Sequence, residues 1–307
     1  MNNVISLDKV VKVYDNKKEH ILAIDRLSFQ VKRGEIFSLV GPDGAGKTTL
    51  IRLMCGIIPL TSGKINILGY DVSREKDEVK KRIGYLSQNF NLYHDLTVDE
   101  NIDFFAEIHK VARYDKRKEE LLQFTRLTPF RDRLAGQLSG GMKQKLALVC
   151  TLIHTPDIIF LDEPTTGVDP LSRRDFWKIL SSLLKFNITI FVTTPYLDEA
   201  ERSSRVALIN SGKLLICDTP VAVKSTLNLD IIEIVCDNVK NAYKLLVDNF
   251  ERSSVQMFGD RLHILTHDVK RAKARVLELL EEKYKIHGLR IISPSLEDVF
   301  VAKMNFQ

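Results

Sequence analysis

The stretch Gly41-Pro42-Asp43-Gly44-Ala45-Gly46-Lys47-Thr48 decides the fold of this chain. It follows the apolar run 36–40 and leads into the helical pattern 49–54, so the motif G-x-x-x-x-G-K-[ST] stands between a buried strand and a helix. In that setting the glycines let successive backbone N–H groups approach phosphate oxygens, and the helix N-terminus directs its partial positive charge at the same anion. The sequence therefore predicts a phosphate-binding loop and a nucleotide ligand.

Acidic residues that suit a nucleotide site follow a second buried strand. The apolar residues 158–161 precede Asp162 and Glu163, which places both carboxylates at the carboxyl end of a parallel strand, where the phosphate loop of a doubly wound sheet also opens. Asp162 is suited to hold Mg²⁺ through its water shell, and Glu163 to accept a proton from an attacking water. In the loop, Lys47 would neutralise the β- and γ-phosphates, and the Thr48 hydroxyl would ligate the metal.

The composition is that of an ordinary soluble protein, with 307 residues, 44% apolar and 28% charged. No stretch approaches 18 uninterrupted apolar residues and the N-terminus lacks the regions of a signal peptide, so we expect a cytosolic chain without a membrane span. A net charge of +5, with basic and acidic residues mixed, does not indicate a nucleic-acid groove. The scattered cysteines predict reduced core thiols: Cys55, Cys150, Cys217 and Cys236.

Strand and helix patterns alternate up to about residue 220, which is typical of an α/β fold. Before the phosphate loop, residues 4–13 and 23–31 predict strands, the second of them half-buried and antiparallel. Residues 97–153 have helical spacing, interrupted by two glycines at 140 and 141. A polar stretch marks a boundary near residue 222, so we expect domains at 1–221 and 222–307.

The C-terminal part predicts a second, smaller α+β domain. Strands are expected at 231–236, 254–258, 262–266 and 289–292, and helices at 239–250, 269–283 and 296–304. Up to residue 292, the order βαββαβ is that of a split, ferredoxin-like unit. Its histidines have no metal-like spacing and are expected to be surface or sheet residues: His263, His267 and His287.

Three further features have two interpretations each from the residues alone. Tyr14 either packs against its strand or stacks on an adenine ring. Gln88, at the end of a strand, is either a surface residue or part of a site. Ser139-Gly140-Gly141, just before a helix, is either a plain N-cap with Ser139 as the capping residue, or a second anion-binding device.

Together these motifs resemble those of the ATP-binding cassette (ABC) superfamily. They are Walker A (41–48), the Q-loop residue Gln88, the signature Leu-Ser-Gly-Gly-Met (138–142), Walker B (158–163) and the D-loop Thr-Gly-Val-Asp-Pro (166–170). The resemblance covers residues 1 to about 220 and implies an ABC-type P-loop NTPase, with a RecA-like α/β core, an antiparallel β subdomain and a helical subdomain. The tail Ser-Pro-Ser-Leu-Glu-Asp-Val-Phe (293–300) is similar to that of stand-alone ATPase subunits of ABC-2 type exporters, such as multidrug and daunorubicin-type systems.

The resemblance implies how these motifs work. Two cassettes dimerise head to tail, and each ATP, with Mg²⁺, lies between the Walker motifs of one and the signature of the other. It assigns nucleotide contacts to Tyr14, Gly41, Pro42, Asp43, Gly44, Ala45, Gly46, Lys47, Thr48, Thr49, Ser139, Gly140, Gly141 and Asp169, metal contacts to Thr48, Gln88 and Asp162, and catalysis to Glu163, Lys47 and Gln88. The partners implied are a second ATPase chain, identical or not, and an ABC-2 type permease contacted near Gln88 and residues 90–130. No nucleic acid is expected, and the chain would sit at the cytoplasmic face of the cell membrane.

One position departs from the family pattern. The strand 188–194 is usually followed by a His that touches the γ-phosphate and orients the water, but here Pro195 follows. Proline has neither a side-chain donor nor an N–H to offer in its place. We expect hydrolysis to depend on Glu163 alone and to be slower, or a partner cassette to supply a complete site.

Two other functions remain as alternatives to the exporter ATPase. The first is a soluble cassette protein acting on ribosomes or DNA; relatives of that kind carry two cassettes or a long coiled coil, whereas this chain has one uninterrupted cassette. The second is a nucleotide-gated binding module with weak turnover, suggested by Pro195. The C-terminal domain would either sense a small molecule or make a dimer or regulatory contact.

Overall fold

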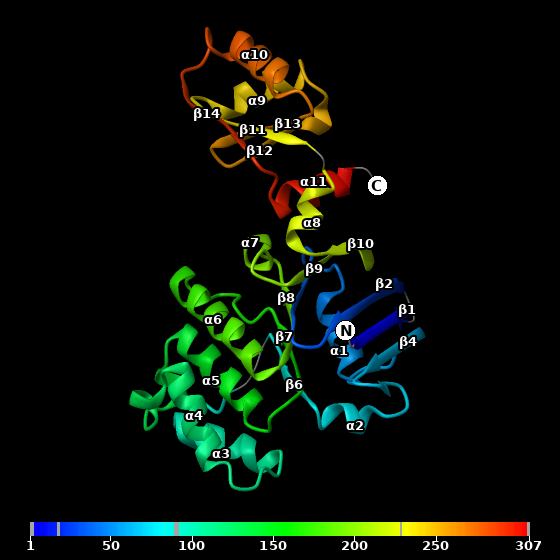
Figure 1. The fold of residues 1–307 in the computed structure, drawn as a ribbon, viewed down its shortest axis with the longest axis vertical. Helices are drawn as coiled ribbons and strands as arrows, with labels where there is room; N and C mark the ends of the chain where they lie inside the picture. Colours follow the sequence, from blue (N-terminus) through cyan, green and yellow to red (C-terminus); the bar gives the residue numbers. More distant parts are fainter. Residues whose placement is uncertain (1–2, 17–18, 89–91, 228, 306–307) are drawn as a thin grey trace. The chain divides into compact units, whose positions relative to one another are not determined.

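The computed structural model describes residues 3–16, 19–88, 92–227 and 229–305 (Figure 1). The sequence also predicts a polar turn at 15–18, between the first two strands, and this turn lies partly outside those ranges. The chain forms two compact units, residues 1–219 and 220–307. Within the described ranges, no helix combines the length and the apolar character that crossing a membrane requires.

A six-stranded sheet forms the centre of the first unit, with the order β10-β9-β3-β8-β7-β6. Its strands are β3 (Ile36–Val40), β6 (Ile83–Leu86), β7 (Ile158–Asp162), β8 (Thr189–Thr194), β9 (Arg205–Asn210) and β10 (Lys213–Asp218). All pairings are parallel except that of β10 with β9. Every residue of β3, β7 and β8 is buried, as expected for parallel strands covered on both faces. The carboxyl ends of β3, β7 and β8 therefore meet at one edge, next to the phosphate loop.

A second sheet has the order β2-β1-β4-β5 and is antiparallel. Its strands are β1 (Asn3–Asn16), β2 (Glu19–Lys32), β4 (Ser62–Ile67) and β5 (Tyr70–Asp71). Strands β1 and β2 are longer than the predicted 4–13 and 23–31. Lys9 has a φ of +45° and the register shifts between Leu7 and Val10, so a bulge separates two apolar runs without ending the strand.

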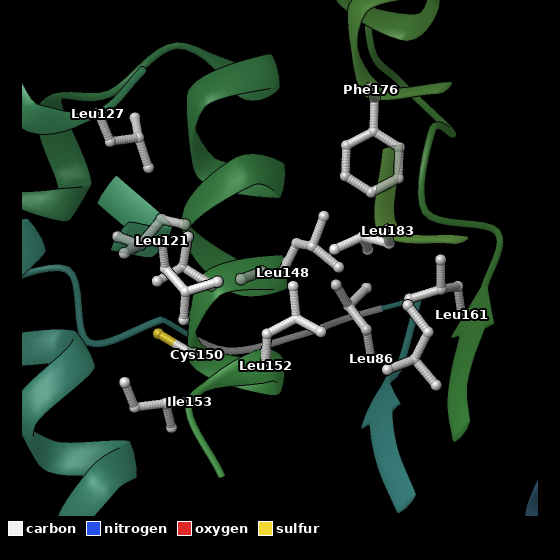
Figure 2. Packing of buried hydrophobic residues seen from close by; sticks show 14 of the residues in the cluster. Leu86, Leu121, Leu127, Leu148, Cys150, Leu152, Ile153, Leu161, Phe176 and Leu183 are labelled. Carbon is white, nitrogen blue, oxygen red and sulfur yellow. The ribbon is translucent and has the colours of Figure 1, made fainter. Parts of the chain in front are cut away.

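Helices surround the central sheet (Figure 1). They are α1 (Lys47–Met54), α2 (Lys76–Lys80), α3 (Val98–Ile108), α4 (Asp115–Thr125), α5 (Gly140–Leu152), α6 (Pro170–Leu183) and α7 (Leu197–Ala200), with short 3-10 turns at Thr128–Phe130, Ala135–Gln137 and Leu184–Phe186. Figure 2 shows buried side chains of α5, such as Leu148 and Leu152, lying between Leu121 of α4 and the sheet residues Leu86 and Leu161. One apolar core thus fixes the helical segment to the strands that carry the site.

The second unit has the order βαββαβ between helices α8 (Pro220–Ser225) and α11 (Leu296–Asn305). Its elements are β11 (Asp230–Cys236), α9 (Val239–Val247), the 3-10 turn Arg252–Ser254, β12 (Val255–Phe258), β13 (Arg261–Thr266), α10 (Val269–Leu280) and β14 (Ile286–Ile292). The sheet order is β12-β13-β11-β14 and all pairings are antiparallel, as in a split βαβ unit. Apolar residues of the strands pack with α9 and α10 in a core of their own.

Candidate nucleotide-binding site

The phosphate loop connects β3 to α1 and packs directly on neighbouring backbone. Gly46 has a φ of +101°, and a Cβ there would lie 2.6 Å from the carbonyl oxygen of Ala23 on β2. A Cβ on Gly41 would lie 2.4 Å from the carbonyl oxygen of Ile209 on β9. Neither position has room for a side chain, so these two glycines fix the path of the loop against both sheets.

A cavity of about 710 Å³ opens over this loop. Eight of the residues predicted to form the site line it: Asp43, Gly44, Gly46, Lys47, Thr48, Thr49, Gln88 and Glu163. Seven further residues complete the lining: Ile21, Leu22, Ala23, Thr166, Pro195, Tyr196 and Ser211. The lining therefore combines a polar end at the phosphate loop with exposed apolar side chains from β2.

Lys47 is buried at the polar end of the cavity, with only 4% of its surface exposed. Its ammonium donates to the carbonyl oxygens of Gly41 (2.8 Å) and Pro42 (3.1 Å) and pairs with Oε1 of Glu163 at 3.0 Å. Its three hydrogens thus meet three acceptors. A phosphate at the loop would compete with these acceptors for the ammonium.

Glu163 has a strained backbone, with a φ of +49°. Its N–H is held by the carbonyl oxygen (3.1 Å) and the hydroxyl (3.0 Å) of Thr193. Its Oε2 accepts from Nε2 of Gln88 (3.0 Å) and from Oγ1 of Thr166 (3.4 Å). A left-handed conformation at a glutamate costs energy and persists only where its surroundings enforce it, so the structure holds this carboxylate in one place.

Asp162 lies beneath the loop at the end of β7. Its Oδ1 accepts from the hydroxyls of Thr48 (3.2 Å) and Thr193 (2.7 Å), whereas Oδ2 is buried and has no hydrogen-bond partner within the described part of the chain. Burial raises the pKa of Asp162 and the negative charge of Glu163 adds to this, while the bonds from Thr193 and Thr48 oppose it. A buried carboxylate oxygen left without a partner beside a threonine hydroxyl fits a divalent cation.

The signature residues and Asp169 of the D-loop lie outside this lining, whereas Thr166, the first residue of the D-loop, is part of it. Ser139 caps α5, as predicted, by accepting from the N–H of Met142 at 3.4 Å. Asp169 caps α6 by accepting from the N–H of Ser172 at 2.9 Å, and hydrogen bonding from Ser172 lowers the pKa of Asp169. Among the described residues, a Cβ on Gly140 would meet nothing within 4 Å, whereas one on Gly141 would lie 2.6 Å from the Ser172 side chain. One chain thus does not bring its signature or Asp169 to its own phosphate loop.

Tyr14 is partly exposed on β1, with the Lys12 ammonium 4.9 Å from its ring centre. Its register partner on β2 is Ile21, which lines the cavity. The aromatic ring therefore lies on the strand pair that forms the apolar end of the site.

The strand end that departs from the family pattern forms part of the cavity wall. Pro195 and Tyr196 both line the cavity, and the Arg173 guanidinium lies 4.6 Å from the ring centre of Tyr196. Two contacts in this region were missed from the sequence, those of Thr193 with Asp162 and of Thr166 with Glu163. The hydroxyl-rich ends of the strand 188–194 and of the Walker B turn were the available signal.

A strand, a glycine loop closing on a buried lysine, and two acids at the end of another parallel strand of the same sheet define a P-loop nucleotide-binding protein. Residues 24–166 match the ABC transporter family. The Nod factor export ATP-binding protein I of Burkholderia thailandensis is 36% identical over 303 residues, covering 97% of this chain and 95% of that protein. The daunorubicin resistance ATP-binding protein DrrA2 of Streptomyces coeruleorubidus is 32% identical with 97% and 94% coverage. The chain belongs to the ABC transporter family, as one of its ATPase subunits.

Other matches agree on the cassette. The probable multidrug ABC transporter ATP-binding protein YbhF of Escherichia coli is 42% identical over 206 residues, and the match spans 66% of this chain but only 36% of that protein. A dimeric, post-hydrolysis structure of the ATP-binding cassette MJ0796 with ADP and phosphate superposes with a TM-score of 0.64 at 26% identity, covering 70% of this chain and 98% of that one. These likenesses confirm the predicted family and the predicted ABC-type fold.

Proposed function

We propose that this chain is the ATP-hydrolysing subunit of an ABC-2 type exporter and works with a separate membrane permease at the cytoplasmic face of the membrane. The observation that carries the catalytic part is the convergence of Lys47, Thr48, Asp162 and Glu163 on one buried edge of the sheet. The export part is supported by relatives of nearly equal length that are named for Nod factor export and daunorubicin resistance. Residues 1–221 would be the nucleotide-binding domain, and residues 222–307 an accessory or regulatory domain.

In the proposed site, each end of the cavity binds one end of ATP. The loop N–H groups and the Lys47 ammonium bind the phosphates, because both supply positive charge in a buried setting. Half-exposed Ile21 and Leu22 would cover the adenine, with Tyr14 stacking beside them. Glu163 is the proton acceptor, since its carboxylate borders the same cavity as Lys47.

Magnesium would be held by Asp162, Thr48 and Gln88. The unpartnered Oδ2 of Asp162 and the hydroxyl that Thr48 now donates to Asp162 are hard oxygen ligands of the kind this ion prefers. The ion supplies charge that neutralises phosphate oxygens. The protein's own part is to orient these oxygens and to exclude water from Asp162.

The second half of each site would come from another copy of the cassette. Ser139 caps α5 and Gly140 and Gly141 begin it, and a helix N-terminus attracts anions. A Cβ on Gly140 would have no neighbour within 4 Å among the described residues. The solved cassette MJ0796, which has this fold, is dimeric in two structures. Binding of two ATP molecules would close the dimer, and hydrolysis would reopen it, which gives the permease its alternating cycle.

The test traps the closed dimer. The full chain carrying Glu163→Gln should be dimeric by light scattering when given ATP and Mg²⁺, because it binds ATP but hydrolyses it slowly. The same chain with ADP, or with Lys47→Ala added, should remain monomeric. A variant that stays monomeric with ATP and Mg²⁺, even together with the membrane protein that copurifies with it, would overturn the proposal.

A further inference from the structure

We infer that Thr166 is a positioning residue for Glu163, and that its hydroxyl takes over part of the role of the side chain that Pro195 lacks. The inference rests on the proposed function, since it assumes that Glu163 accepts the proton from water. It concerns one hydrogen bond, from Oγ1 of Thr166 to Oε2 of Glu163.

The Glu163 carboxylate has three partners among the described residues: Lys47 on Oε1, and Gln88 and Thr166 on Oε2. Two of these partners would make other contacts when ATP and metal are bound, because Lys47 would bind the phosphates and Gln88 the ion. Thr166 has no such second task. It is therefore the donor that stays with Glu163 when the site is loaded.

Thr166 is held in place by the same turn that holds Glu163. The N–H of Thr166 donates to the carbonyl oxygen of Glu163 at 3.2 Å, so residues 163–166 form a closed turn. Inside it, the hydroxyl of Thr165 donates to Glu199 at 2.9 Å and anchors the turn to α7. Because the distance between Thr166 and Glu163 is set within three residues, it does not depend on helical or partner movements.

The bond matters more here than in cassettes with the usual histidine. Pro195 borders the cavity and has no hydrogen to donate. A carboxylate held through Oε2 by Thr166 keeps Oε1 available for the water once Lys47 has moved to phosphate. Orientation of this kind acts on the chemical step and leaves nucleotide binding almost unchanged.

The test compares, in the full chain, a replacement that keeps the size of threonine but not its hydroxyl with one that keeps the hydroxyl. Thr166→Val removes the donor and should lower kcat about tenfold, while KM and the affinity for a fluorescent ATP analogue stay within about twofold. Thr166→Ser keeps the donor and should retain at least about half of the wild-type kcat. In a Pro195→His background the histidine orients the water. There the fold loss in kcat caused by Thr166→Val should be less than half of the fold loss in the wild-type background.

Each contrary result has one meaning. A wild-type kcat for Thr166→Val, an equal loss for Thr166→Ser, or an undiminished loss in the Pro195→His background would overturn the role of Thr166 and leave the ATPase assignment intact. Absence of ATP binding and phosphate release in the wild-type chain would instead overturn the proposed function itself.

Discussion

The ammonium of Lys47 lies 3.0 Å from Oε1 of Glu163, and both side chains are more than nine-tenths buried. The cation that would bind phosphate and the carboxylate that would accept a proton therefore neutralise each other. A triphosphate would compete with Glu163 for the ammonium, which has only three hydrogens to share. If phosphate displaces Glu163 from Lys47, the proposed base would become available only when substrate is bound.

The first prediction concerns the strength of this pair. Glu163→Gln replaces a charged partner of Lys47 with a neutral one, so the metal-free affinity for ATP should increase by about three- to tenfold. Phosphate release should fall at least about a hundredfold, because the proton acceptor is gone. Calorimetric titration with ATP in chelator, together with a phosphate-release assay, measures both.

Asp43 provides the matched comparison for that prediction. Its carboxylate is 3.8 Å from the Lys47 ammonium, but its side chain is almost fully exposed, so solvent screens the attraction. Asp43→Asn should change ATP affinity less than Glu163→Gln does. Weaker ATP binding by Glu163→Gln would show that the pair does not compete with phosphate.

The second prediction concerns pH and magnesium. Because burial raises the pKa of Asp162 above its ordinary 3.8, this carboxyl becomes neutral at a higher pH than an exposed aspartate. Metal binding requires the charged form, so the apparent Mg²⁺ affinity of the ATP complex should fall by about tenfold per pH unit below that pKa. Magnesium titrations of the ATPase rate at a series of pH values from neutral downwards should show this in the wild type. Asp162→Asn should bind the ion weakly at every pH, and an equal pH dependence in that variant would contradict the assignment.

The sequence alone located the residues that lie in contiguous motifs. The phosphate loop and the acids after residues 158–161 are read from local spacing, and the structure brings Lys47, Thr48, Gln88 and Glu163 to one cavity. The contact of Thr193 with Asp162 depends on β7 and β8 being neighbours, although 31 positions separate the two residues. The contact of Thr166 with Glu163 depends on a left-handed backbone conformation at Glu163, and a glutamate in the sequence does not predict such a conformation. Such contacts follow from packing and strain, and single-sequence patterns do not contain either.

The third prediction uses the two signature glycines to separate folding from dimer closure. Gly140→Ala should leave stability equal to the wild type or raise it by up to about 1 kcal/mol, because the added Cβ would touch none of the described residues and alanine favours helix. If a partner's phosphate lies over this position, the same change should abolish ATP-induced dimerisation in the Glu163→Gln background. Thermal unfolding and light scattering measure the two effects separately.

Gly141→Ala is the counterpart. A Cβ at this position would stand 2.6 Å from the Ser172 side chain, so we expect a loss of roughly 1–3 kcal/mol of stability without any partner. A Gly140→Ala chain that dimerises as well as its parent would argue against a signature that faces a second nucleotide.

The fourth prediction concerns the tail, which the sequence left without a role. Asp298 of α11 is fully buried, and its Oδ2 accepts from the N–H (2.8 Å) and hydroxyl (2.5 Å) of Ser295. Its Oδ1 lies 3.1 Å from Nδ1 of His263 on β13, whose Nε2 lies 3.4 Å from Glu233 on β11. His263 was expected to be a surface or sheet residue, and it is a buried residue of the sheet. The tail motif thus attaches α11 to the sheet through a histidine between two carboxylates.

The charges around this histidine come from several elements. Glu233 also accepts from Arg261 on β13 (3.0 Å) and Arg290 on β14 (2.6 Å). Burial works against its charge, but these donors and His263 prevail and lower the pKa of Glu233 to about 2. Burial likewise opposes the charged form of His263, but Asp298 and Glu233 prevail and raise its pKa. Burial opposes the charge of Asp298 as well, and His263 and Ser295 lower its pKa.

These directions set a pH window for the attachment of α11. The stability that the charge of His263 contributes is fully present below the ordinary histidine pKa of 6.5. It is lost as the pH rises through the higher pKa that His263 has in the folded chain. The stability that Glu233 and Asp298 contribute is fully present above their ordinary pKa values of 4.5 and 3.8, and it is lost on acidification. Hydrogen-exchange protection of α11 in the full chain, corrected for intrinsic rates, should therefore be greatest at about pH 5–6 and should decrease towards pH 9.

Replacement of the histidine tests the attachment directly. His263→Ala leaves Asp298 buried without its cation and should destabilise the second unit by roughly 3–5 kcal/mol, with loss of protection in α11 at pH 6. His287→Ala is the control, because His287 pairs with Asp237 at an exposed site and its loss should leave α11 protected. Protection that does not change between pH 6 and pH 9 in the wild type would mean that the His263 charge does not hold the tail. The expected outcome is that α11 loosens on alkalinisation through this one ring, while the first unit keeps its protection.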